Sequence, residues 1–446
     1  MSPQREQEAL SELTLPEALS IAIQLQRAGH LDEAETVYRR MLEIEPDHAD
    51  ALHFLGVLLH QRGSGDAAVE LIEKSIALQP GQPDRHNNLG NVFVELGKLP
   101  EATHAYEKAI ALQPGHADAY NNLGAVLRAR GQFEEAAAAY QKAVDLDPNH
   151  VNAYNNFGNL LSSRGMVKEA LEYYCKAVTA QPSHAPSRKL LGIAYYRIGQ
   201  IERAANVFHD WLRDEPNNPI ALHMLAACSG QDVPARASDA YVEATFDGFA
   251  GSFDEKLERL DYRAPQLIAQ ALETACDAPG KRLTALDAGC GTGLCGPLIA
   301  PYVSRLTGVD LSAGMLAKAQ GRGVYDQLVK AELTAFLEDR AGEYDLIVSA
   351  DTLVYFGALE PVLAAAFRAL RPGGLLIFTV EEIDATAAAD YRINPHGRYS
   401  HSRPYLSRAI PAAGLSLLAL DPAVLRNEGG NPVAGLVATA RKARRE

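Results

Sequence analysis

A 34-residue period runs through the first half of this chain and limits what that half can fold into. Prolines, glycines and alanines each recur at this spacing. The three series are Pro46, Pro80, Pro114, Pro148, Pro182 and Pro216; Gly56, Gly90, Gly124, Gly158 and Gly192; and Ala34, Ala68, Ala102, Ala136, Ala170 and Ala204. Such a period indicates a stack of similar supersecondary units, because one unit alone cannot bury its apolar face.

The residue types within the period indicate two packed helices per unit. Glycine or alanine is needed where two helices cross closely, and a large ring fills the space beside each crossing. The candidate rings are Tyr106, Tyr140, Tyr174 and Phe208. The proline that follows ends the second helix, because it has no N–H and its ring fixes φ.

The pattern of one unit resembles the tetratricopeptide repeat. It reads Tyr120-x2-Leu123-Gly124-x2-Leu127, then Ala136-x3-Tyr140, then Pro148. The resemblance implies an all-α tetratricopeptide-repeat solenoid over residues 1–228, with six 34-residue repeats at about 15–218 followed by a capping helix.

Asparagine pairs recur at one register in three successive repeats, although Asn is unfavourable in the middle of a helix. Asn88, Asn122 and Asn156 are the second members of these pairs. Because an amide both donates and accepts, such a row could clamp an extended peptide backbone. The row resembles the asparagine ladder of the O-GlcNAc transferases, which holds protein substrates. The alternative is that these are solvated consensus residues of the repeat.

The charge of the chain favours a basic partner. Asp84 and Asp118 lie one turn before asparagine pairs and Asp50 has the same register in the preceding repeat, so we expect an acidic groove that prefers a basic protein or peptide segment. The whole chain has 42 Lys and Arg against 56 Asp and Glu, a formal net charge of −14. This balance argues against nucleic-acid binding, which depends on phosphate neutralisation.

Apolar run lengths and cysteines indicate a soluble cytoplasmic protein. No apolar run approaches the roughly 18 residues of a membrane helix, and the opening residues lack the apolar core of a secretion signal. The five cysteines include no CxxC pair, so we expect no disulfide framework, no metal site and a reducing compartment. The sequence leaves the oligomeric state open.

The second half changes pattern after a linker-like segment at 229–240. Strand-length apolar runs then alternate with helical stretches over 241–446, which is typical of a parallel sheet with crossover helices. The runs are Leu283–Asp287, Leu306–Asp310, Gln327–Lys330, Tyr344–Ala350, Leu375–Val380, Leu415–Leu420 and Val433–Ala440. Ligands of such folds bind at the carboxyl ends of the strands.

The first strand leads into a glycine-rich loop, DAGCGTG over 287–293, which lets a cofactor approach the backbone. The dinucleotide spacing GxGxxG is broken by Leu294. Asp287 in this loop would repel a pyrophosphate and attract an ammonium or sulfonium group. Asp310, at the end of the second strand, is placed to accept both hydroxyls of a ribose. These features fit S-adenosyl-L-methionine.

The motifs resemble those of class I S-adenosylmethionine-dependent methyltransferases: DAGCGTG, then GVDLS with a following methionine, then YDLIVSAD and RPGG. The resemblance implies an α/β Rossmann-like domain with a mainly parallel seven-stranded sheet. It also implies cofactor-binding roles for Asp287, Gly289, Cys290, Gly291, Gly293, Asp310, Leu311, Met315, Glu332 and Asp351.

Three further segments resemble a family of predicted bacterial methyltransferases with N-terminal tetratricopeptide repeats. They are FDGFAGSFDEKLERLDYRAP (246–265), GRYSHSRPYL (397–406) and RNEGGNPVAG (426–435). Members of this family mostly lack an assigned substrate, so the resemblance implies a fold and a cofactor and leaves the acceptor open.

The acceptor side must be read from the residues themselves. The fourth strand continues as DTLVY rather than the Asn/Asp-Pro-Pro-Tyr motif of planar-nitrogen methyltransferases. His401 and His396 are candidate bases, and Tyr355 is the third candidate for a catalytic role. Arg398 and Tyr399 are candidate substrate-binding residues, in a segment whose rings and cations suit a carboxylate-bearing or peptide acceptor. The alternative for His401 is a purely structural hydrogen bond.

Two functions remain open from the sequence. In the first, the repeats recruit a protein or peptide acceptor that the second domain methylates. In the second, the enzyme methylates a small molecule, and the repeats serve only assembly or scaffolding.

Overall fold

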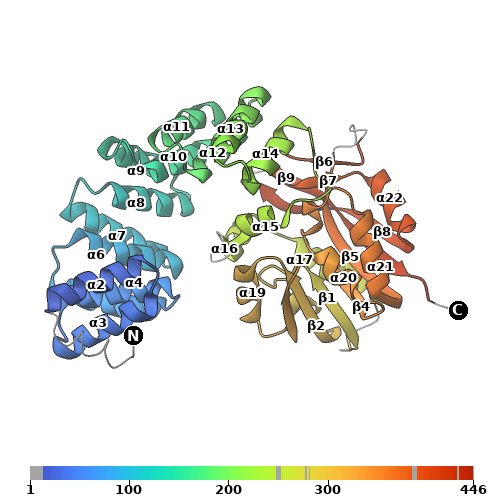
Figure 1. Cartoon of the computed structure of the whole chain (residues 1–446), viewed down its shortest axis with the longest axis horizontal. Helices are drawn as coiled ribbons and strands as arrows, with labels where there is room; N and C mark the ends of the chain where they lie inside the picture. Colours follow the sequence, from blue (N-terminus) through green and yellow to red (C-terminus); the bar gives the residue numbers. More distant parts are fainter. Residues whose placement is uncertain are drawn as a thin grey trace. The chain divides into compact units, whose positions relative to one another are not determined.

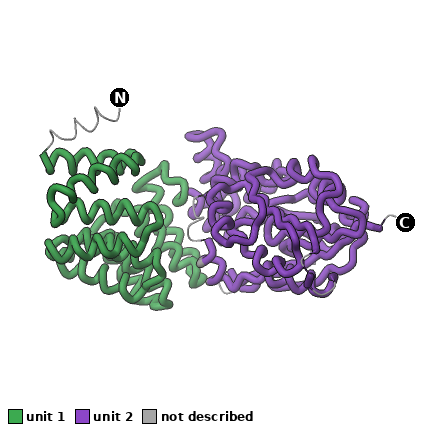
Figure 2. The backbone as a smooth tube through the Cα atoms, turned by 90° about the horizontal axis from the view of Figure 1, so that it is seen from below, with its two compact units in different colours: residues 1–187 green, residues 188–446 purple. Residues whose placement is uncertain are grey.

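The computed structural model describes residues 14–247, 253–276, 279–280, 282–383, 389–428 and 431–444. The chain divides into two compact units, Met1–Ser187 and Arg188–Glu446 (Figure 2). This division falls inside a helix of the repeats rather than at the sequence-based boundary of 228, and the predicted domain limits stay a prediction. None of the helices in these ranges is long and apolar enough to cross a bilayer.

Antiparallel helix pairs follow one another through the repeats, as the sequence predicted (Figure 1). The helices are α2 (Leu15–Arg27), α3 (Leu31–Ile44), α4 (Ala49–Gln61), α5 (Gly65–Leu78), α6 (Pro83–Glu95), α7 (Leu99–Leu112), α8 (Ala117–Ala129), α9 (Phe133–Leu146), α10 (Val151–Ser163), α11 (Val167–Ala180), α12 (Ala185–Arg197), α13 (Ile201–Asp214) and α14 (Pro219–Ser229). The last of them is the expected capping helix.

Close helix crossings explain the periodic glycines. A Cβ atom added to Gly124 would lie 2.7 Å from the ring of Tyr140, and one added to Gly158 would lie 2.5 Å from the ring of Tyr174. Carbon atoms do not approach this closely, so any larger residue would push the two helices apart. The predicted pairing of glycine and ring is confirmed at the crossings from Gly90 to Gly192, whereas Gly56 meets the aliphatic side chain of Ile72.

The second unit is a three-layer α/β structure around a nine-stranded sheet. The strands are β1 (Leu283–Ala288), β2 (Val303–Asp310), β3 (Gln327–Lys330), β4 (Tyr344–Ser349), β5 (Leu370–Glu382), β6 (Tyr391–Ile393), β7 (Tyr399–His401), β8 (Leu415–Glu428) and β9 (Asn431–Lys442). The order β3-β2-β1-β4-β5 is parallel, and β9 and β8 continue it antiparallel. These seven strands match the expected sheet, and the short hairpin β6–β7 adds two at the end of β5.

Helices cover both faces of this sheet (Figure 1). One core lies beneath α20, α21 and α22, and the other beneath α17 and α18. The helices of the α/β part are α15 (Asp239–Phe246), α16 (Phe253–Arg259), α17 (Ala264–Ala275), α18 (Gly296–Ile299), α19 (Ala313–Gln320), α20 (Leu333–Glu338), α21 (Glu360–Ala369) and α22 (Arg403–Ala412), with a 3₁₀ turn, η2 (Leu353–Tyr355). The apolar strand runs are therefore buried on both faces, as in a doubly wound sheet.

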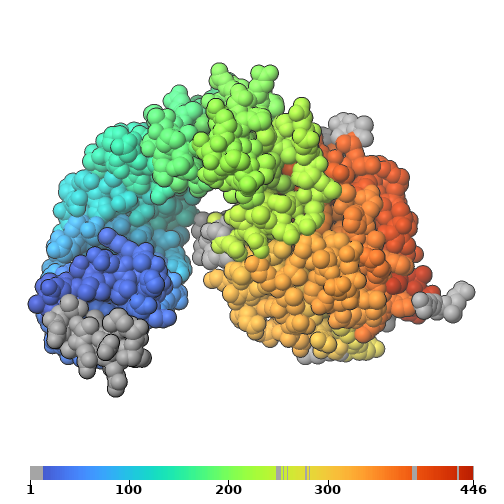
Figure 3. Space-filling view, viewed as in Figure 1, coloured from blue at the N-terminus to red at the C-terminus, as the bar shows by residue number. Residues whose placement is uncertain are grey.

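The segment 229–240, expected to be a linker, is held along the α/β part. Ala235 accepts hydrogen bonds from the backbone of Gly357 and Ala358, and Ala237 N–H donates to the carbonyl of Tyr355 at 2.8 Å. The composition of this segment suggested a free connection, but its backbone groups pair with the loop after η2. In the space-filling view, the yellow-green atoms of this region lie directly against the orange and red part (Figure 3).

Candidate functional site

A cavity of about 290 Å³ lies at the carboxyl ends of β1, β2 and β4, where the fold rule places a ligand. Most of the residues predicted to bind cofactor or acceptor line it. These are Asp287, Gly289, Cys290, Gly291, Asp310, Leu311, Met315, Glu332, Asp351, Tyr355 and Arg398. Gly293 does not line the cavity: it has φ +83°, and a Cβ there would lie 2.9 Å from the Tyr325 ring, so its role is in the turn.

The glycine loop presents bare backbone to the cavity. Gly289 has φ +74°, and a Cβ there would lie 2.1 Å from Thr352 Oγ1, so only glycine fits. Gly291 has φ +53°, and the nearest atom to a Cβ there is a ring carbon of Phe253 at 4.0 Å. A side chain at position 291 would occupy this open space. Glycine leaves the space for a ligand that lies against the backbone.

Two carboxyl groups flank this loop. Asp287 is 1% exposed, and its Oδ2 accepts a 2.6 Å hydrogen bond from the Tyr325 hydroxyl. The pKa of Asp287 is raised to about 7, mainly by burial; the Tyr325 hydrogen bond opposes this shift and the nearby Asp310 adds to it. Asp310 accepts hydrogen bonds from the backbone of Gly291 and Ser312, each at 2.9 Å, and burial raises its pKa as well.

Glu332 lies at the cavity edge but already caps a helix. Its carboxylate accepts hydrogen bonds from Thr334 N–H at 3.0 Å and Ala335 N–H at 2.8 Å, at the start of α20. Such a cap fixes the carboxylate in position. The cofactor-binding role that the resemblance implies for Glu332 would use its remaining lone pairs, and it stays a prediction.

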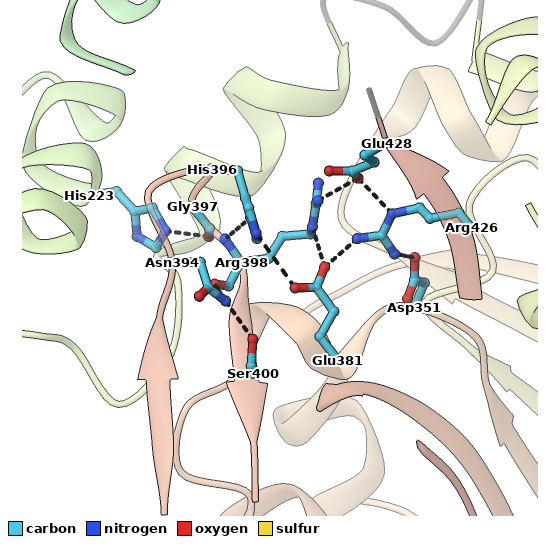
Figure 4. Close-up of polar contacts among 10 residues, drawn as sticks. All are labelled: His223, Asp351, Glu381, Asn394, His396, Gly397, Arg398, Ser400, Arg426 and Glu428. Carbon is cyan, nitrogen blue, oxygen red and sulfur yellow. Dashed lines mark hydrogen bonds and ion pairs between the residues drawn. The ribbon is translucent and has the colours of Figure 1, made fainter. Parts of the chain in front are cut away.

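The opposite end of the cavity carries a buried ion network (Figure 4). Arg426, 2% exposed, donates to Asp351 at 2.5 Å, to Glu428 at 2.7 Å and to Glu381. Arg398 donates to Glu381 at 2.6 Å and to Glu428 at 2.5 Å. The two guanidinium groups are thus matched by three carboxylates, and the network is held by charge-assisted bonds.

Asp351 joins this network to the cavity. It has φ +58°, a left-handed conformation that Asp tolerates better than most residues, and its N–H donates to Thr379 Oγ1 at 2.8 Å. Its Oδ2 accepts from Arg426, while its buried Oδ1 has no hydrogen-bond partner among the residues that the structure describes. Burial raises the pKa of Asp351, and Arg426 opposes this effect.

Three of the predicted acceptor-side residues lie outside the cavity. His401 is fully buried, and its Nε2–H donates to the carbonyl of Gly357 at 3.0 Å. Tyr399 is also fully buried, and its hydroxyl donates to the carbonyl of Pro234 at 2.8 Å. His396 is exposed, 3.6 Å from Glu381. His401 and Tyr399 therefore secure the β6–β7 hairpin, which corrects the expectation that they meet a substrate.

The sequence missed three members of the ion network. Arg426 and Glu428 lie on β8, in the RNEGG segment that was noted only as a family mark, and Glu381 ends β5 directly after its apolar run. Glu381 could have been found from the sequence, because a charged residue that directly continues a buried apolar strand indicates a buried ion pair. Arg398 and Arg403 are paired with Glu381 and Glu382, and the predicted binding of a carboxylate-bearing or peptide acceptor by this segment stays a prediction.

The asparagines of the repeats bond to one another. Asn122 Nδ2 donates to Asn87 Oδ1 at 3.0 Å and to Asn91 Oδ1 at 3.3 Å, and Asn156 Nδ2 donates to Asn121 Oδ1 at 2.9 Å. Each of these bonds links one repeat to the one before it. The ladder therefore has an architectural role that neither of the two sequence-based interpretations contained.

Asn88 and the acidic row also have partners in the neighbouring repeat. Asn88 Nδ2 lies 3.2 Å from His53 Nε2, whose strongly lowered pKa of about 4 follows mainly from burial. Asp84 lies 3.1 Å from His116, and Asp118 lies 3.1 Å from His150. The carboxylates are therefore partly engaged within the repeats.

Comparison with protein families matches both halves of the chain. A methyltransferase-domain model covers residues 286–378. Tetratricopeptide-repeat models cover 19–83, 87–151, 139–172 and 161–228.

The curated relatives of this chain include methyltransferases. Methyltransferase-like protein 27 of Homo sapiens is 34% identical over 30% of this chain and 55% of its own length. A malonyl-[acyl-carrier protein] O-methyltransferase of Enterobacter lignolyticus is 30% identical over 31% of this chain and 55% of its own length. This chain thus spans about half the length of these two relatives. Among solved structures, YrrB, described as a TPR protein with an unusual peptide-binding site, is 26% identical over 42% of this chain and 96% of its own, with a TM-score of 0.33.

Proposed function

Because this chain combines tetratricopeptide repeats with a class I methyltransferase domain, we propose that it transfers a methyl group from S-adenosyl-L-methionine to a hydroxyl or amine acceptor. The observation that carries the proposal is the composition of one cavity. Bare glycine backbone and the carboxyl groups of Asp287 and Asp310 line one end, and Asp351, whose buried Oδ1 has no partner among the described residues, lines the other.

The cofactor end fits S-adenosylmethionine better than a dinucleotide. Asp310 would accept the ribose hydroxyls, and an ionised Asp287 would favour a cationic group in the cavity over a pyrophosphate. Gly291 leaves room for a ligand against the backbone, and Met315 and Leu311 offer apolar contact. When bound, the cofactor supplies an electrophilic methyl group on a sulfonium.

The residues of the acceptor end orient the acceptor and take its proton. Methyl transfer is an in-line displacement, so the protein contributes mainly by holding the acceptor in position and excluding water. Apolar side chains including Phe246, Leu257 and Tyr262 line the cavity and serve the second purpose. Asp351 Oδ1 would accept the proton of the acceptor while Arg426 holds Oδ2, and Tyr355 would line the path.

The charge of the network favours a hydroxyl or an amine over a carboxylate acceptor. Asp351, Glu381 and Glu428 outnumber Arg398 and Arg426 by one charge. All three donor atoms of Arg426 are engaged, so an incoming carboxylate would meet a net negative, already satisfied cluster. An acceptor that donates a hydrogen bond would instead satisfy Asp351 Oδ1.

We further propose that the acceptor reaches the enzyme on a protein or peptide segment bound by the repeats, since stacked repeats offer an extended concave surface. A second candidate is a small-molecule acceptor, with the repeats serving assembly. The engaged amides of Asn122 and Asn156 favour this second candidate, because their hydrogen bonds already join neighbouring repeats. The name of the Enterobacter relative, an O-methyltransferase, is consistent with an oxygen acceptor in either case.

Transfer of labelled methyl groups into a lysate tests this proposal. Purified protein and labelled S-adenosylmethionine are added to lysate, which is then separated into protein and metabolite fractions. We expect label in one fraction with the natural chain and with Asp421→Ala, an exposed carboxylate on β8, and much less with Asp310→Ala when the cofactor is below saturation. Label in protein supports recruitment and label in metabolites supports the second candidate. No transfer together with no cofactor binding would contradict the proposed activity.

A further inference from the structure

The last repeat helix contacts the methyltransferase part through one buried histidine. His223 of α14 donates from Nε2–H to the carbonyl of Gly397 at 2.8 Å, across 174 residues of sequence. Its ring is 4% exposed and stacks on Tyr241, with ring centroids 3.8 Å apart. Burial, with Lys189 nearby, lowers the pKa of His223, so the imidazole is neutral and has a single N–H to donate.

Gly397 belongs to a tightly specified turn between β6 and β7. Its N–H donates to the carbonyl of Asn394, and Asn394 N–H donates to the carbonyl of Arg398, both at 2.8 Å. Gly397 has φ +87°, and a Cβ there would lie 2.2 Å from the Tyr241 hydroxyl. The turn therefore fits against α14 and α15 only with glycine at this position.

The residue after this turn enters the cavity. Arg398 pairs with Glu381 and Glu428, both of which also bind Arg426, and Arg426 holds Asp351. Figure 4 shows the unbroken series of contacts from His223 through Gly397 and Arg398 to Asp351. No group in this series lies free on the surface, so a displacement of the turn has to be taken up by the ion network.

We propose that α14 is a structural part of the methyltransferase site, and that His223 is a positioning residue for its acceptor end. The inference rests on the proposed function, because it concerns the acceptor end of the same cavity. His223 fixes the turn, the turn fixes Arg398, and Arg398 fixes the carboxylates that orient Arg426 and Asp351. The cofactor end, built on β1 and β2, is connected to α14 less directly, through the stacking of His223 on Tyr241 of α15 and the hydrogen bond that Ser312 Oγ donates to Asp247 at the end of α15.

The helix α14 is therefore more than a detachable end of the repeats. Cys228 and its neighbour Ala227 at the end of α14 are buried, and Ala227 shares an apolar cluster with Ile393 and Tyr399 of the hairpin. A ligand of the repeats that moved α14 would change the acceptor end without entering the cavity.

Hydrogen exchange of the full chain, followed by mass spectrometry, tests the link directly. His223→Leu removes the donor, His223→Gln retains an N–H donor, and Leu222→Ala changes the exposed side of the same helix. We expect His223→Leu to raise exchange of residues 391–401 by about two- to tenfold, the range for one lost hydrogen bond. His223→Gln should restore most of the protection, and Leu222→Ala should match the natural chain.

Affinity for S-adenosylhomocysteine, measured by calorimetry, separates this proposal from the proposed function. We expect this affinity to change by less than about twofold in all three variants. In labelled transfer, His223→Leu should need more acceptor than the natural chain to reach the same rate. Unchanged exchange of 391–401 in His223→Leu, or equal effects of Leu and Gln, would overturn the positioning role. If His223→Leu does not fold, His223→Phe, which can keep the ring stacked on Tyr241 but cannot donate to Gly397, is judged by the same exchange. Loss of cofactor binding in the natural chain would count against the proposed function and leave the exchange result valid.

Discussion

The Tyr325 hydroxyl donates a 2.6 Å hydrogen bond to Oδ2 of Asp287, inside the loop where a cationic ligand is expected. Burial raises the pKa of Asp287 to about 7, so this carboxyl group changes charge near neutral pH. In the unfolded chain the same group has a pKa of about 3.9. The folded protein therefore binds more protons than the unfolded chain between these two values.

The raised pKa of Asp287 predicts opposite pH trends for stability and for cofactor affinity. Without ligand, its contribution to stability is present at low pH and is lost as pH rises from about 4 through 7, because ionisation of a buried carboxyl is unfavourable. Affinity for S-adenosylmethionine should instead rise over roughly pH 5.5–7, by at most about tenfold per unit, because only the ionised form attracts the cation. Calorimetric titrations across this range measure the second trend.

Asp287→Asn is the matched control, because an amide oxygen can still accept from Tyr325. Its affinity for S-adenosylmethionine should be lower at pH 7 and nearly independent of pH below that value. The same pH dependence in Asp287→Asn and in the natural chain would assign the effect to another group.

Asp310→Ala tests the proposed ribose contact. Removing hydrogen bonds to a charged acceptor costs about 1.5–3 kcal/mol, so the dissociation constant for S-adenosylmethionine should rise roughly 10- to 150-fold. The substitution also releases the N–H groups of Gly291 and Ser312, so part of the loss arises from a looser loop. Calorimetry with NAD alongside decides the cofactor class, since tighter binding of NAD would contradict the assignment.

Local spacing predicted most of the fold. The 34-residue period predicted the helix pairs, because each repeat packs only on its neighbours. In the second half, the predicted strand Gln327–Lys330 coincides with β3. β5 is longer than the predicted Leu375–Val380, because the RPGG motif at Arg371–Gly374 is an irregularity within the strand: Tyr344 pairs with Leu370 and Leu346 with Leu375. Short-range patterns do not distinguish a bulge from a turn.

The arrangement of the acceptor end could not be predicted, because it depends on contacts between residues that are far apart in the sequence. Arg426 lies 75 residues from Asp351 in sequence, and only the antiparallel return of β8 and β9 beside β5 brings them together. His401 and Tyr399 were chosen for their chemistry, which suits catalysis and buried hydrogen bonding equally well. The motif around Asp287 and Asp310 was readable because a strand end and a glycine loop are local features.

Asn122→Ala should destabilise the repeats rather than strengthen their helices. Alanine gains several tenths of a kcal/mol in helix propensity, but the change removes hydrogen bonds to Asn87 and Asn91, each worth about 0.5–1.5 kcal/mol. We expect a net loss of roughly 1 kcal/mol in denaturant unfolding. Asn152→Ala, an exposed position on α10, is the control and should be neutral or slightly stabilising. Equal stability of the two variants would show that the ladder is solvated.

The contacts of α14 predict how the second half behaves when it is cut from the repeats. A fragment of 235–446 keeps the cofactor end but exposes Tyr399 and Ile393, which pack against Ala227. Partial loss of this buried apolar surface should lower the free energy of unfolding by about 2 kcal/mol. The melting temperature of the 235–446 fragment should therefore be roughly 4–8 °C below that of a fragment of 183–446. Both should bind S-adenosylhomocysteine. Equal melting temperatures would support the sequence-based boundary at 228 as the limit of an independent domain.

Asp351→Asn is the sharpest test of the acceptor end. Asn tolerates the left-handed backbone at this position, and Arg426 retains Glu381 and Glu428, so the fold should persist. The amide cannot take up the acceptor proton, and loss of a general base lowers the rate constant by about 10²–10⁴-fold. Cofactor affinity should remain close to that of the natural chain.

The pH profile separates a base from a positioning group at this residue. Because burial raises the pKa of Asp351, the rate of the natural chain should rise with pH as this carboxyl ionises, at a pH above the usual range for Asp. That limb should vanish in Asp351→Asn, whereas a merely misplaced acceptor would keep it and raise the Michaelis constant instead. Asp421→Asn, exposed on β8, controls for the change of charge. Natural turnover in Asp351→Asn across the pH range would remove Asp351 from the mechanism and leave a reaction in which the acceptor arrives already deprotonated.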